Sequence, residues 1–179
     1  MAAVALTVTG CGQATAGRAV PGAERPSPVS TARSTTTTTA EFVPDYSNTA
    51  LCKLLTAQEA EGLGGAPEGK PLNSTADGHA QCQWSADTSV TLGFQKGVHS
   101  TDARTDPGYT NTPTTVQGLS AMQSVTTDPI EICQILVDVS PDAVIYGVAA
   151  NRSGGEGKYQ PCDVANQLIN IVIPKVTQR

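Results

Sequence analysis

The segment at residues 130–150, IEICQILVDVSPDAVIYGVAA, has the strongest β-strand pattern in the chain. Apolar side chains alternate with others along both of its halves, at Cys133, Ile135, Val137 and Val139 and then at Val144, Tyr146 and Val148. Such alternation is typical of a strand that buries one face. Ser140-Pro141-Asp142 separates the halves with residues that favour turns. The segment therefore predicts two antiparallel strands, at 130–139 and 143–150.

Further elements are predicted on both sides of this pair. Residues 81–84 and 89–95 form strands around a turn at Asp87-Thr88, and residues 116–125 form another strand. Residues 48–55 predict a short helical turn, and Thr56 with Glu59 makes a capping box that starts a second helix. Pro161 suits the first position of a third helix. The apolar face of this third helix is formed by Cys162, Ala165, Ile169 and Val172, and Pro174 lies at or near its end.

These elements predict an α+β fold. We expect an antiparallel sheet of four or five strands with N-terminal and C-terminal helices packed on one face. The polar stretch at residues 96–115 has no periodicity and is predicted to be a long loop, a type of segment that is often functional or mobile.

Four isolated cysteines lie on predicted buried faces: Cys52, Cys82, Cys133 and Cys162. An even number of cysteines in an exported domain implies two disulfides. A zinc site would need closely spaced pairs of cysteines. Four free thiols would suit a cytosolic protein. Four cysteines allow three connectivities. We expect Cys52–Cys82 and Cys133–Cys162, because this pairing ties a helix to a strand in each case.

A short apolar run at the N-terminus ends in Val8-Thr9-Gly10-Cys11. This order resembles a bacterial lipobox, which implies cleavage before Cys11 and attachment of a lipid to its thiol. The alternative is a free or buried cysteine on an irregular cytosolic terminus. We interpret residues 1–10 as the remnant of a signal peptide, although no Lys or Arg precedes the apolar run.

Residues 11–45 are rich in Thr, Pro and Ala and poor in large apolar residues. A segment of this composition buries too little apolar surface to fold, so we expect a disordered tether. Residues 46–179 then form the disulfide-bonded domain.

Composition excludes two broad classes of protein. The net charge of −5 and the lack of a basic patch argue against nucleic-acid binding. No apolar run reaches the roughly 18 residues of a membrane-spanning helix.

An ordered set of motifs resembles the actinobacterial lipoproteins of the DUF3558 family. The set comprises Cys52-x-Leu54-Leu55-Thr56-x-x-Glu59, Leu63-Gly64, Cys82-x-Trp84, Gly118-x-x-Ala121, Cys133 before a Val/Ile strand, and Pro161-Cys162-x-x-Ala165-x-x-Leu168. The resemblance covers residues 46–179. It implies a lipid-anchored, disulfide-bonded domain on the extracytoplasmic face of the cell membrane, and it carries over no catalytic residues.

Two classes of function remain. The first is a non-catalytic binding or accessory lipoprotein, which holds a small apolar ligand or docks on a membrane-protein partner. The second is a cell-wall hydrolase or another envelope enzyme. His79 and His99 both lie in polar stretches that we expect to be exposed, with no acid placed to orient them. We therefore expect no catalytic residues, no cofactor and no metal, and we favour the binding protein.

Overall fold

A computed structural model describes residues 46–72, 79–102 and 108–177. These residues form one antiparallel sheet of seven strands in the order β1-β2-β3-β7-β6-β5-β4. The strands are β1 (Lys70–Leu72), β2 (His79–Ser85), β3 (Thr88–Lys96), β4 (Thr110–Val116), β5 (Leu119–Thr126), β6 (Ile132–Ser140) and β7 (Ala143–Asn151). The predicted tether and Cys11 lie outside the described residues.

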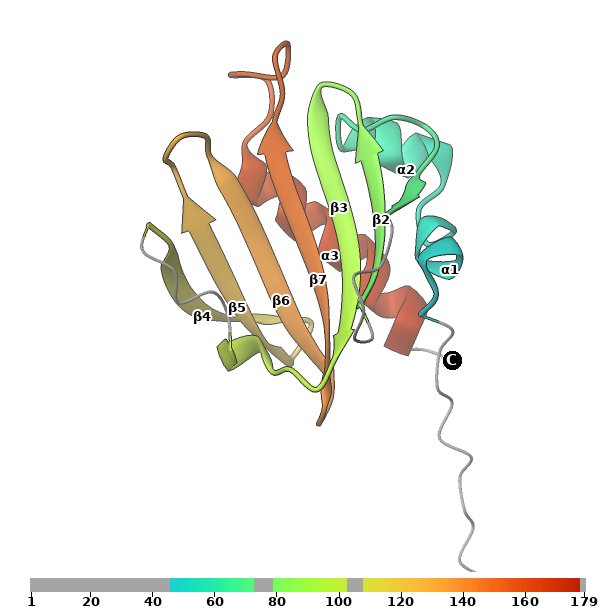
Figure 1. Cartoon of the computed structure of the whole chain (residues 1–179), viewed down its shortest axis with the longest axis vertical. Helices are drawn as coiled ribbons and strands as arrows, with labels where there is room; N and C mark the ends of the chain where they lie inside the picture. The colour runs from blue at the N-terminus through green and yellow to red at the C-terminus, as the bar shows by residue number, and fades with distance from the viewer. Residues whose placement is uncertain (1–45, 73–78, 103–107, 178–179) are drawn as a thin grey trace, which may run out of the picture. The chain divides into compact units, whose positions relative to one another are not determined.

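The strand order divides the sheet into two meanders. β1, β2 and β3 form the first, and β4 to β7 form the second, so that β3 and β7 meet at the centre of the sheet. Between the meanders the chain runs through a 3-10 turn, η1 (Ser100–Asp102), to the far edge of the sheet (Figure 1). The hairpin predicted at 130–150 forms β6 and β7 with the expected pairing.

The long helix α3 (Pro161–Thr177) covers one face of the sheet, behind β3, β7 and β6 in Figure 1. Pro161 opens this helix, where its missing N–H costs no hydrogen bond. The side chains that α3 buries against the sheet are Val164, Ala165, Leu168, Ile169, Val172 and Ile173. They pack on Cys133, Ile135, Val137, Ile145 and Ala149, which face the helix from β6 and β7. Burial of this apolar surface is the main source of the fold's stability.

Two short helices, α1 (Asn48–Cys52) and α2 (Ala57–Gly62), lie near the edge of the sheet formed by β1 and β2. Ser47 caps α1, and Thr56 with Glu59 forms the predicted capping box at the start of α2. Disulfides join Cys52 to Cys82 and Cys133 to Cys162, the same two pairs that the sequence pattern favours. Each disulfide ties a helix to a strand of the sheet.

The antiparallel sheet, the C-terminal helix and the two disulfides are confirmed, but two details of the predicted fold are wrong. The sheet has seven strands rather than four or five. The N-terminal helices are short and lie beside the β1–β2 edge. Leu51, Ala60 and Leu63 join the same buried core as α3, but α3 covers most of that face of the sheet.

The additional strands are both edge strands with weak sequence signals. β1 has three residues and includes Pro71. β4 exposes six of its seven residues and contains Pro113, so it lacks the apolar alternation by which a strand is recognised in sequence. All of β4 except Val116 falls in the stretch predicted as a loop.

Candidate functional site

The face of the sheet opposite α3, which we call the open face, carries no α-helix in the part of the chain that the structure describes (Figure 1). Val144, Tyr146 and Val148 of β7 point toward it, because Ile145, Gly147 and Ala149 point toward α3. The alternation predicted for β7 is therefore present, but it marks the open face rather than the helix-covered core. β7 is apolar on both faces because it lies at the centre of the sheet.

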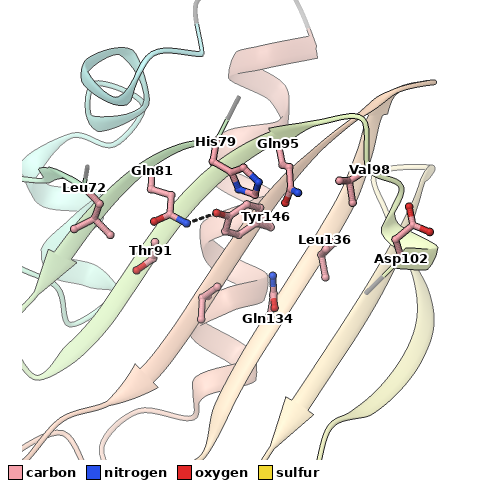
Figure 2. Close-up of a pocket in the computed structure, with 11 residues that line it drawn as sticks. Leu72, His79, Gln81, Thr91, Gln95, Val98, Asp102, Gln134, Leu136 and Tyr146 are labelled. Carbon is pink, nitrogen blue, oxygen red and sulfur yellow. Dashed lines mark hydrogen bonds between the residues drawn. The ribbon is translucent and has the colours of Figure 1, made fainter. Parts of the chain in front are cut away.

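The open face is hollowed over β2, β3, β7 and β6, with a cavity volume of about 620 Å³ (Figure 2). Among the described residues, the lining combines uncharged polar side chains with apolar ones and has a single carboxylate. It consists of Leu72, His79, Gln81, Thr91, Gln95, Val98, Asp102, Gln134, Leu136, Tyr146 and Val148. A volume of this size is typical of small-molecule sites.

Tyr146 forms the floor of the hollow. Its ring lies over Gly93 of the neighbouring strand, where a Cβ atom would overlap the ring. The Tyr146 side chain is only 6% exposed, and its hydroxyl accepts a hydrogen bond from the Gln81 amide. The glycine thus allows a large ring to lie flat against the sheet, and Gln81 fixes its outer end.

Glutamine amides surround this ring. Gly93 and Leu136 lie directly opposite Tyr146 on the two neighbouring strands, so Gln95 of β3 and Gln134 of β6 occupy diagonal positions on either side of it. Figure 2 shows both side chains beside the ring. Within residues 46–72, 79–102 and 108–177, neither amide has a hydrogen-bond partner, so both can bind a ligand.

Residues 97–102, which follow β3, close one end of the hollow. Val98 and Asp102 line the hollow from this segment, which is held against the sheet at Ser100. The Ser100 backbone N–H and hydroxyl both donate to the Asp138 carboxylate, each over 2.7 Å. Ser100 is almost fully buried, so this contact fixes the position of the rim. The prediction that residues 96–115 are a long loop is thus wrong for Lys96, which ends β3, for η1 and for the residues of β4 up to Thr115.

Asp102 also accepts a hydrogen bond at the rim. Its Oδ2 lies 2.8 Å from the backbone nitrogen of His99, which donates to it. No group of three or more His, Cys, Asp or Glu side chains suited to a metal ion occurs among the described residues.

The expectation that both histidines are exposed is wrong for His79. This residue begins β2, is half-buried and lines the hollow, because the strand starts earlier than the sequence pattern indicated. His99 is exposed and outside the hollow. Of the described lining residues none is a serine or cysteine, so the hollow does not pair a histidine with either nucleophile.

A second, shallower hollow of about 460 Å³ shares His79 and lies beside α1. The Tyr46 and Phe94 rings stack there with centroids 3.7 Å apart. Burial raises the pKa of Tyr46 above its usual value, so its hydroxyl stays neutral at physiological pH. This stack packs the start of the domain, at Tyr46, against Phe94 of β3.

Sequence reasoning did not identify the residues that define the larger hollow. Gln81, Gln95 and Gln134 occupy the polar positions of alternating strands, and such positions are read as solvent-exposed. The one available signal was Tyr146, which lies in a strand with apolar residues at consecutive positions and therefore buries both faces. The predicted lipidation site, Cys11, is outside the described residues.

None of the helices in the described part of the chain has both the length and the apolar character needed to cross a membrane. The model of the family described as "Protein of unknown function (DUF3558)" matches residues 6–175. No curated protein and no solved structure matches the chain.

Proposed function

This chain belongs to the DUF3558 family, and we propose that it is an exported envelope lipoprotein with a non-catalytic binding role. Lipid on Cys11 anchors it to the extracytoplasmic face of an actinobacterial cell membrane. Residues 11–45 serve as the tether, and the domain that follows holds a small, largely apolar molecule in the hollow of the open face.

Two features support export and anchoring. Cys52–Cys82 and Cys133–Cys162 are bonds of the kind that persist in oxidising compartments and are rare in the cytosol. Cys11 follows an aliphatic residue and two small ones, the order that a lipid-transferring enzyme recognises in exported precursors.

The hollow is the observation that carries the binding role. It combines a cavity of small-molecule size, an apolar floor and a few polar groups converging on it. Protein docking has less support, because Ile130 is the one strongly exposed large apolar side chain among the described residues and a docking surface needs a contiguous patch.

One experiment tests both parts of the proposal. Wild-type protein expressed in an actinobacterial host should fractionate with membranes, and Cys11→Ala should be released in soluble form. The released protein needs no detergent, so native mass spectrometry can detect a molecule bound to it without a covalent bond. Cys11→Ala that stays with the membrane would contradict the anchoring role, and released protein with no added mass would contradict the binding role.

Two tryptophan substitutions locate the bound molecule. Thr91→Trp fills the hollow from β3 and should remove the added mass. Thr114→Trp is the control, because Thr114 is exposed on the edge strand β4 and lies outside the lining of the hollow. Loss of the molecule from both variants, or from neither, would show that the hollow does not hold it.

The same preparation discriminates the binding protein from an envelope enzyme. His79 is the one imidazole among the described lining residues, and histidine is the side chain that most often serves as a general base in enzymes. We expect His79→Gln to retain the bound molecule with its mass unchanged on incubation, as in the wild type. Conversion of the molecule to a second mass by the wild type, and not by His79→Gln, would overturn the non-catalytic role.

A further inference from the structure

The division of the hollow into a polar and an apolar side indicates what it binds. We infer that the hollow selects an uncharged amphiphile, a molecule with a hydroxyl- or amide-bearing head group and an apolar body. This inference rests on the proposed binding function and adds the chemical class of the ligand.

The polar side of the hollow is built by β2 and β3. His79, Gln81, Thr91 and Gln95 extend from these strands, and Gln134 joins them across Tyr146 from β6 (Figure 2). A glutamine amide offers two N–H donors and a carbonyl acceptor, and a hydroxyl group both donates and accepts. A head group with several hydroxyls or amides can therefore pair with this side of the hollow without leaving polar atoms unsatisfied.

The apolar side is built by β6, β7 and the segment after β3. Leu136 and Val98 form it with the face of the Tyr146 ring, and Val148 extends it to the point where Thr91 and Gln134 lie opposite Val148 on the two neighbouring strands. Leu136 and Tyr146 belong to a small apolar cluster of their own, with Val98, Met122 and Val148 packed against it. An alkyl chain on this surface removes apolar area from water on both partners, which stabilises the complex.

The charges in the lining argue for an uncharged ligand. No lysine or arginine belongs to the described lining, so a phosphate or carboxylate would lack a permanent cationic partner. The single carboxylate, Asp102, lies at the rim and already accepts a hydrogen bond from the His99 backbone. Burying a charge without a partner costs much more than burying a hydrogen-bonded neutral group.

Octyl β-D-glucoside below its critical micelle concentration is a suitable probe, because it carries four hydroxyls on an uncharged ring and one alkyl chain. Three comparison molecules test the parts of the probe. Octyl sulfate and octyltrimethylammonium keep the chain and replace the sugar with a charged group, and methyl β-D-glucoside keeps the head group without the chain.

We expect calorimetric titration of the released Cys11→Ala protein to show saturable binding of octyl β-D-glucoside. Each comparison molecule should bind at least about tenfold more weakly, since loss of two hydrogen bonds or of several buried methylenes exceeds the energy of a tenfold change. Changing Gln95→Leu and Gln134→Leu together should weaken glucoside binding by about tenfold or more for the same reason. Gln58→Leu, on the exposed surface of α2, is the matched control and should leave affinity unchanged.

Other outcomes overturn the inference. Equal or tighter binding of octyl sulfate or octyltrimethylammonium would show that the hollow selects a charged ligand. Glucoside binding that persists in both the double leucine variant and Thr91→Trp would place the amphiphile elsewhere on the protein. If no probe binds while protein from the host still carries a molecule that Thr91→Trp removes, the ligand class is wrong and the binding role stands.

Discussion

Two glycines allow side chains to pack closely on opposite faces of the same central strands. Gly93 in β3 leaves room for the Tyr146 ring on the open face. On the other face, a Cβ atom at Gly147 would lie 2.9 Å from side-chain atoms of both Leu168 and Ile169. The absence of a side chain at Gly147 therefore determines how closely α3 approaches the sheet.

We expect Gly147→Ala to lower the free energy of unfolding by about 1–3 kcal/mol, because the added methyl group overpacks the interface between β7 and α3. Denaturant unfolding followed by circular dichroism measures the change. Gly62→Ala in α2 is the control, since a Cβ atom there meets nothing within 4 Å. Equal stabilities of Gly147→Ala and Gly62→Ala would show that α3 shifts without cost.

For single residues, the sequence predicts those properties that depend on neighbouring residues in the chain. The helix or strand at each cysteine follows from local pattern, and these elements favoured the disulfide pairs that the structure has. His79 was misjudged, because β2 starts earlier than the sequence pattern indicated and pairs His79 with Gln95 of β3. The glutamines around Tyr146 were missed because strand register decides that they meet.

Among the elements, α2 and α3 are joined by one side chain with two roles. Glu59 completes the capping box of α2, accepting from the Thr56 backbone N–H over 2.8 Å. Its carboxylate also accepts from Lys175 near the end of α3, over 2.8 Å. The hydrogen bond from Lys175 is the largest cause of a lowered pKa at Glu59, and the bond from Thr56 adds to it. The carboxyl group is therefore more acidic in the folded chain than in the unfolded chain.

This difference predicts a loss of stability in acid. A group with a depressed folded pKa stabilises the fold above its unfolded value, here about 4.5, and loses that contribution as the pH falls through the folded value. The free energy of unfolding of wild type should exceed that of Glu59→Gln at pH 7, and the difference should shrink as the pH falls below about 4.5.

Urea unfolding at pH 7 and at pH 3 measures this difference. Glu61→Gln is the control, because Glu61 is exposed in the same helix and makes no ion pair within the described residues. A gap between wild type and Glu59→Gln that stays constant or widens in acid would contradict the role assigned to Lys175.

The elements that sequence predicted correctly are those with one buried face and a regular period. β2, β3, β6 and α3 follow this pattern, β7 keeps the period but buries both faces, and the capping box located the start of α2 to within a residue. The edge strands β1 and β4 were not predicted as strands, because each has one hydrogen-bonded neighbour and a proline, and neither alternates in burial. The pairing of β3 with β7 leaves no local signal, so the strand order could not be predicted either.

For the whole molecule, the two disulfides connect the helices to different meanders. Cys52–Cys82 spans 30 residues and attaches α1 to β2, while Cys133–Cys162 spans 29 residues and attaches α3 to β6. Each bond restricts the unfolded chain. On the chain-entropy model, closing a loop of this length raises the free energy of unfolding by about 3–4 kcal/mol.

We expect the paired changes Cys52→Ala with Cys82→Ala, and Cys133→Ala with Cys162→Ala, each to lower the free energy of unfolding by about 2–5 kcal/mol. Thermal and denaturant unfolding of the two variants measure the effect, and wild type treated with reductant should reproduce the loss of both. Alkylation of all four thiols in native, unreduced protein would contradict the disulfide pairing.

The order of strands also constrains the sequence of events during synthesis. β3 has its partner on one side, β2, as soon as residues 79–96 have left the ribosome, but its other edge pairs with β7, where Lys96 meets Ala143 and Thr88 meets Asn151. In a chain that emerges N-terminus first, the second edge of β3 therefore has no partner until residues 143–151 have emerged. The pairing of β3 with β7 can form only once residues 143–151 have emerged, and α3, which follows them in the chain, covers that pairing. A nascent chain stopped anywhere before Asn151 would present an unpaired strand edge, which is the kind of surface that holding chaperones protect.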